Sequence, residues 1–74
     1  MGRVWFVPKL LSSDEIVKIL QANGFEFVSQ RGSHQKYRNG SGESVIVPAG
    51  RRQIPRGTTL SIIRQSRLDR SLFN

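Results

Sequence analysis

Two tight turns divide the middle of the chain into three short extended segments. Arg31-Gly32 follows the alternating apolar and polar residues of segment 25–30, and a Gly-rich turn at 39–42 follows segment 33–38. Glycine and asparagine adopt the backbone conformations that short hairpin turns require. A third extended segment, 43–47, ends at Pro48. The pattern predicts three strands that pair antiparallel in chain order, with the first strand buried on one face.

Helical segments flank the three strands. Ser12 followed by Glu15 forms a capping box, and Gly24 supplies a stop, so a helix is predicted between them. A second helix is predicted to begin near position 58 or 59 and to run to Ser66, followed by a short turn over 68–73 that Asp69 can cap. The order predicts an α+β fold, α-β-β-β-α, with both helices on one face of a three-stranded antiparallel sheet.

The length of 74 residues predicts a single domain, 1–74, with an N-terminal extension over 1–11. So small a domain has a thin core, and we expect its ligand to lie on a surface. Trp5 and Phe6 in the extension either pack on the core or contact a partner. The longest apolar run, 4–7, is too short to cross a membrane, and the chain has no cysteine, which fits a reducing, cytoplasmic environment.

The charge balance indicates a polyanionic partner. Twelve Lys and Arg residues against five Asp and Glu residues give a formal net charge of +7, and nine of the twelve are arginine. The arginine side chain offers a planar fork that binds phosphate and stacks on bases. Nucleic acid is the expected partner, and an acidic protein that covers the same surface is the alternative.

Segment 33–38 carries the candidate functional residues. Read as a strand, it places His34, Lys36 and Arg38 on one face and Tyr37 on the other, so that an imidazole and two cations share a face. Ser33, which the same alternation places on the face of Tyr37, is a candidate to hydrogen-bond a phosphate oxygen of the ligand. Arg51 and Arg52, in the loop after the third strand, are candidate contacts to a nucleic-acid backbone, although a loop of this kind can also be merely solvated.

Four blocks of the sequence together are similar to those of the HicA family. They are Gly24-Phe25, the block Gly32-Ser33-His34-Gln35-Lys36-Tyr37, Val45-Ile46-Val47-Pro48, and Ile54-Pro55-Arg56-Gly57-Thr58 with the helix that contains Ile62-Ile63-Arg64-Gln65. The resemblance runs from about residue 8 to residue 68. Family members often carry a Gln-Ala-Gly-Leu run after the second helix, where this chain has Gln65-Ser66-Arg67-Leu68.

The resemblance implies a toxin of a toxin–antitoxin pair with a fold similar to a double-stranded-RNA-binding domain. It implies a ribosome-independent endoribonuclease that cleaves mRNA, with His34 as the catalytic residue, and a HicB-type antitoxin as the partner that covers the active face. We expect no cofactor and no metal, because the chain has no cluster of carboxylates to hold an ion.

The chemistry of RNA is compatible with this expectation. The 2′-hydroxyl is a nucleophile within the substrate, and an imidazole can accept or donate a proton at neutral pH. One histidine cannot fill both roles in one step, so Lys36, Tyr37 or water would fill the second. Two rival functions need no catalysis: an RNA-binding module of the same fold, and a domain that docks an acidic protein.

Overall fold

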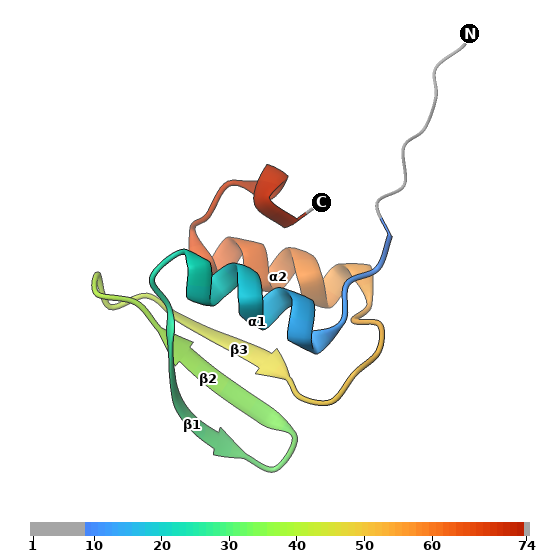
Figure 1. Ribbon diagram of the computed structural model, residues 1–74, viewed down its shortest axis with the longest axis horizontal. Helices are drawn as coiled ribbons and strands as arrows, with labels where there is room; N and C mark the ends of the chain where they lie inside the picture. Colours follow the sequence, from blue (N-terminus) through green and yellow to red (C-terminus); the bar gives the residue numbers. More distant parts are fainter. Residues whose placement is uncertain (1–8, 74) are drawn as a thin grey trace, which may run out of the picture.

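The five predicted elements occur in the predicted order. A computed structural model of the chain describes residues 9–73, so the expectations for Trp5 and Phe6 lie outside the described residues. The elements are α1 (Ser13–Ala22), β1 (Glu26–Arg31), β2 (His34–Arg38), β3 (Ser44–Pro48) and α2 (Arg56–Ser66), followed by a 3₁₀ turn, η1 (Arg70–Phe73). The sheet has the order β1-β2-β3 and is antiparallel throughout. The two helices lie side by side over one face of the sheet (Figure 1).

The β1–β2 turn lies one residue later than the sequence predicted. Arg31 pairs with His34, so the two turn residues are Gly32 and Ser33, and Ser33 precedes the strand instead of beginning it. Gly32 has a φ of +59°, a value that a residue with a Cβ adopts only with strain. The glycine takes the strained position of the turn, and the strand begins at His34.

The predicted capping box at the start of α1 is confirmed. Glu15 N donates to Ser12 Oγ at 3.1 Å, and Ser12 N donates to Glu15 Oε1 at 2.9 Å. The bond from the Ser12 backbone, with Lys9 beside the carboxylate, lowers the pKa of Glu15 below its ordinary value. Two of the free N–H groups at the helix start are thereby satisfied by local sequence.

The start of α2 corrects the sequence prediction. The helix begins at Arg56, before the positions 58 and 59 that were expected, and Pro55 occupies the cap position without a side-chain hydrogen bond. Thr59 N donates to Pro55 O at 3.0 Å, the first bond of the helix. Pro55 adopts an extended conformation, with φ −56° and ψ 147°, that leads directly into the first turn. A helix that begins without a hydroxyl cap carries no such signal in its sequence.

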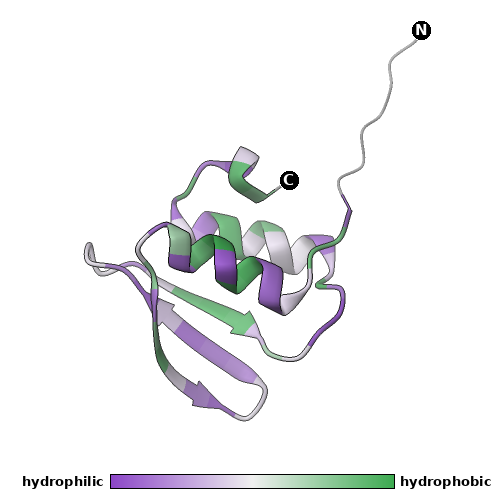
Figure 2. Ribbon diagram, in the orientation of Figure 1, coloured by the Kyte–Doolittle hydropathy of each residue, from purple (hydrophilic) through white to green (hydrophobic). Residues whose placement is uncertain are grey.

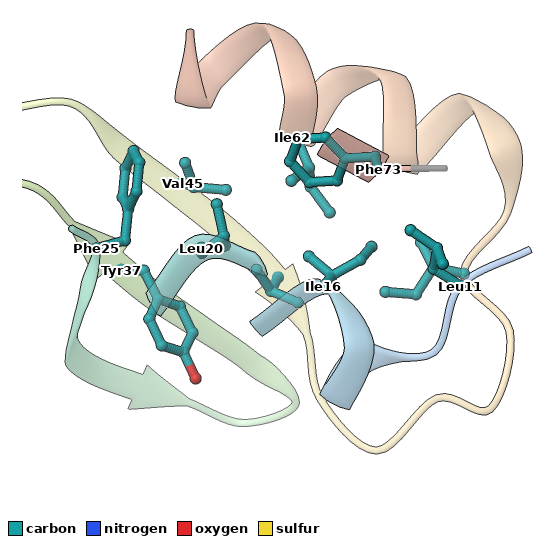
Figure 3. Close-up of a cluster of buried hydrophobic side chains, with 10 residues drawn as sticks. Leu11, Ile16, Leu20, Phe25, Tyr37, Val45, Ile62 and Phe73 are labelled. Atoms are coloured by element: carbon teal, nitrogen blue, oxygen red, sulfur yellow. The ribbon is translucent and has the colours of Figure 1, made fainter. Parts of the chain in front are cut away.

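The core fills the space between the helices and the inner face of β2 and β3. Figure 3 shows its members, which come from α1, α2, η1, β2 and β3 and from the segments that flank these elements. The buried apolar residues are Leu11, Ile16, Leu20, Phe25, Tyr37, Val45, Val47, Ile54, Ile62 and Phe73. Tyr37 therefore belongs to the core, as its place opposite His34 and Lys36 predicted. Phe73 closes the core from η1, and Asp69 Oδ1 accepts from Ser71 N at 2.8 Å as the predicted cap.

The prediction that the first strand is half buried is wrong. Every residue of β1 is exposed, because β1 lies beyond the area that the helices cover (Figure 1). Phe25 reaches the core from the position before the strand, whereas Phe27 is 52% exposed and packs edge-on against Tyr37, with ring centroids 5.8 Å apart. An irregularity in pairing between Phe27 and Ser29 bends the strand and shifts its alternation.

Candidate functional site

His34 opens the central strand on the face of the sheet that the helices leave uncovered. It pairs with Arg31 on β1 and with Pro48 on β3, and its side chain is exposed. Lys36 and Arg38 follow on the same face, since Tyr37 between them points into the core. Figure 2 shows the contrast between a hydrophilic β2 and a hydrophobic β3 beside it. The predicted basic face with one imidazole is therefore present.

A groove of about 550 Å³ runs between this end of the sheet and α2. Three parts of the chain form its walls: the β1–β2 turn with the start of β2, the strand β3 with the loop after it, and one side of α2. The lining residues are Ser33, His34, Ile46, Pro48, Ala49, Arg51, Gly57, Thr58, Ser61, Ile62 and Gln65. Of the residues predicted from sequence, the groove thus brings together Ser33, His34 and Arg51.

The position of Arg51 is fixed by the first residue of α1. Ser13 is buried, and its Oγ donates to Pro48 O and accepts from Arg51 N at 2.9 Å. Ser13 N donates in turn to Arg51 O at 2.9 Å. Ala49 N donates to Ser33 O at 2.7 Å, which ties the same loop to the turn before His34. These hydrogen bonds fix the backbone at Arg51 and the turn before His34 relative to each other.

The other three predicted residues lie outside the groove. Lys36 and Arg38 lie further along β2, and Arg38, four residues from His34, is about 13 Å away along the strand. Arg38 Nε is 3.4 Å from Ser44 Oγ, at the far end of the sheet. Arg52 is exposed in the loop but does not line the groove. A ligand that touches all of them must be extended, as a polynucleotide is.

The wall that α2 contributes was not predicted from the sequence. Thr58, Ser61 and Gln65 recur at intervals of three and four residues, which places them on one side of a helix. Gln65 Oε1 accepts from Ile46 N at 3.1 Å, so α2 lies along the outer edge of β3. The spacing alone could have suggested a polar stripe. That the stripe faces His34 follows only from the packing of α2 against β3.

The donors in the groove suit proton transfer and anion binding. His34 and Arg51 are among its lining residues, together with residues that carry hydroxyl and amide groups. Among residues 9–73, no group of three or more His, Asp or Glu side chains is placed to hold a metal ion. Neither helix within that range combines the length and the apolar character that a membrane crossing needs.

The family assignment follows from a match to a family model. The model described as "HicA toxin of bacterial toxin-antitoxin" matches residues 13–68, which is most of the chain and includes every element from α1 to α2. A comparison with curated proteins found no match. The matched region contains the strand of His34, the loop of Arg51 and the whole α2 wall of the groove. The chain belongs to the HicA family of toxins of bacterial toxin–antitoxin systems.

Proposed function

We propose that this toxin is a metal-independent endoribonuclease that cleaves mRNA without a ribosome, with His34 as general acid or base. The observation that carries the proposal is the position of His34. The only histidine of the chain lies on the wall of a groove, on a basic face, with Arg51 on the same groove. If His34 were only a solvated surface residue, there would be no reason for it to share a groove with Arg51.

The reaction can be written with groups that this face offers. The 2′-oxygen of one nucleotide bonds to the adjacent phosphorus, and the bond from phosphorus to the 5′-oxygen breaks. One proton leaves the 2′-hydroxyl and one proton is delivered to the departing 5′-oxygen. His34 performs one of these transfers, and Lys36 or water performs the other. A cyclic 2′,3′-phosphate and a free 5′-hydroxyl result.

Tyr37 is not suited to the second proton transfer. Its hydroxyl group donates to Gln35 Oε1 at 2.9 Å on the core side of the sheet, and burial raises the pKa of the phenol. The side chain points away from the face that carries His34. Of the three candidates from the sequence, Lys36 and water remain.

The cations of the face would bind the negative charge of the substrate. Arg51 is the cation on the groove itself and is the one suited to the phosphate that reacts. Lys36, Arg38 and Arg52 lie beyond it and would bind neighbouring phosphates, with Ser33 adding a hydroxyl donor beside His34. The net charge of +7 supports this assignment.

The test is to compare the wild-type protein with His34→Ala and His34→Gln on unstructured RNA, without ribosomes. Loss of a general acid or base typically slows a reaction by about 10²–10⁴-fold, and we expect both variants to lose cleavage to that extent. Thermal melting checks that they remain folded. Cleavage that persists in folded His34→Ala protein, or that requires added divalent metal, would contradict the proposal.

A non-catalytic RNA-binding module is the second candidate. The exposed basic face of β2 favours it equally, since phosphate binding requires no proton transfer. In that case RNA binds with an affinity that falls with salt, and RNA incubated with wild-type protein stays intact. The same experiment therefore separates the two functions.

The partner of a toxin in such a pair is an antitoxin, and we propose one of the HicB type that covers the active face. Because His34 and Arg51 both lie on an open groove, a protein seated there would block access of RNA directly. Acidic groups set against the basic face would speed the association.

A further inference from the structure

We propose that the groove beside His34 is a binding site for one unpaired nucleoside of the RNA, and that the Gln65 side chain reads its base. The inference rests on the proposed function, because it assumes that RNA binds at the site of His34. It concerns the α2 wall, which has no part in the proton transfers described above.

The groove has room and groups for a base in addition to the phosphate that Arg51 would bind. Ile46, Pro48 and Ala49 contribute apolar surface to a lining that is otherwise polar, and Ile46 is 41% exposed. Arg51 is the single cation among the lining residues. Pockets for small organic ligands combine apolar walls with a few polar groups and typically have volumes of ~300–1,000 Å³. The groove, at about 550 Å³, falls within that range.

The amide of Gln65 is held in one orientation at this wall. A backbone N–H group can only donate, so the bond from Ile46 N at 3.1 Å fixes the amide oxygen toward β3. The two N–H bonds of Nε2 and the second lone pair of Oε1 are then available on a side chain that lines the groove. Paired donors and acceptors of this kind distinguish bases by their edges. Thr58 and Ser61, on the same wall, add hydroxyl groups.

The location of the groove requires an unpaired nucleoside. It lies at the edge of the sheet, between β3 and a helix, so a base must turn out of a stack to enter it. In an A-form duplex the Watson–Crick edges are paired with each other and the major groove is too narrow for side chains, so proteins read RNA sequence mainly on single strands. Single-stranded RNA is therefore the expected substrate class.

Gln65→Glu tests the inference, because a carboxylate at this position can still accept from Ile46 N but offers no donor. The variant is made in a His34→Ala background, so that RNA stays intact, and binding to labelled hexauridylate, hexaadenylate and hexacytidylate is measured by fluorescence anisotropy. Adenine, cytosine and uracil each present both donors and acceptors, in a different arrangement at their edges. We expect Gln65→Glu to change the three affinities by unequal factors, about tenfold apart, because the lost donor matters differently to each arrangement, whereas an added charge alone acts on all three equally.

Gln21→Glu is the matched control, since it adds the same negative charge on an exposed position of α1. It should lower all three affinities by one small, common factor. If Gln65→Glu also lowers all three by one common factor, or if an RNA duplex of twelve base pairs binds as tightly as the single strands, the nucleoside site is disproved.

Cleavage by proteins that retain His34 separates this inference from the proposed function. If wild-type protein cleaves RNA and the Gln65→Glu protein cuts at the same positions, the nuclease stands and the nucleoside site fails. If base-dependent binding changes as expected but wild-type protein leaves RNA intact, the nucleoside site stands and the nuclease fails.

Discussion

Arg67 is the one described residue other than glycine with a positive φ. Its φ is +61°, and it ends α2 by donating its N–H group to the carbonyl oxygens of Ile63 and Arg64. Family members often carry glycine at this point, and glycine adopts the left-handed conformation without strain. Ser66 beside it is buried, with its Oγ donating to Ile63 O and accepting from Leu68 N, so the turn is kept in place by its neighbour.

We expect Arg67→Gly to be more stable than Arg67→Ala by about 1 kcal/mol, because only the first change relieves the left-handed strain. Both substitutions remove the exposed ion pair of Arg67 with Glu43, at 3.7 Å, so the comparison cancels its contribution. Urea unfolding of the two variants gives the difference. Equal stabilities would mean that the backbone at position 67 carries no strain.

At the scale of elements, β2 separates the core from the basic face that carries His34. Tyr37 buries one side of the strand against Phe27 and the helices, while His34, Lys36 and Arg38 occupy the other. β1 and β3 supply the hydrogen bonds on both edges, so β2 can carry polar side chains on a whole face and remain fixed. The strand thus holds its cations at a regular spacing.

Replacement of Lys36 by alanine should weaken RNA binding equally for all sequences and reduce the slope of log affinity against log salt by about 0.7–1 unit, the effect of one lost phosphate contact. The measurement is a salt titration of RNA affinity in the His34→Ala background. Lys18→Ala, which removes an exposed cation from α1, is the control and should leave the slope unchanged. A Lys36→Ala effect confined to some base compositions would instead indicate contact with a base.

For the molecule as a whole, the candidate site lies on the surface, outside the core. One cluster of buried residues supports both helices and the sheet, and the groove with His34 lies at the junction of β3 and α2. RNA and an antitoxin would therefore use the same surface. If RNA and the antitoxin cannot bind at the same time, the antitoxin inhibits the toxin by covering its RNA-binding surface.

We expect the cognate HicB-type antitoxin to displace labelled RNA from the His34→Ala protein, with no complex that contains both. We also expect Arg51→Glu to slow association with the antitoxin several-fold at low salt, since charge complementarity acts mainly on the association rate. Arg70→Glu, an equal change of charge in η1, is the control. Native mass spectrometry that detects protein, RNA and antitoxin in one complex would refute occlusion.

The sequence by itself determined the elements whose signals are local. The capping box of Ser12 and Glu15, the turn at Gly32 and the Asn39 loop each depend on residues within a few positions of one another. The alternation of His34, Lys36 and Arg38 against Tyr37 likewise depends only on the period of a strand. These local signals were enough to predict the order of the helices and strands and the basic face of β2.

The tertiary structure alone decided how far the helices reach and what faces His34. β1 lies outside the helices' cover, so its apolar alternation did not lead to burial. Gln65 meets Ile46 across nineteen positions of sequence, and Ser13 meets Arg51 across thirty-eight. Contacts of this separation form because the helices pack on the sheet to bury a shared core. The residues close to His34 in the sequence therefore do not predict that α2 forms the opposite wall of its groove.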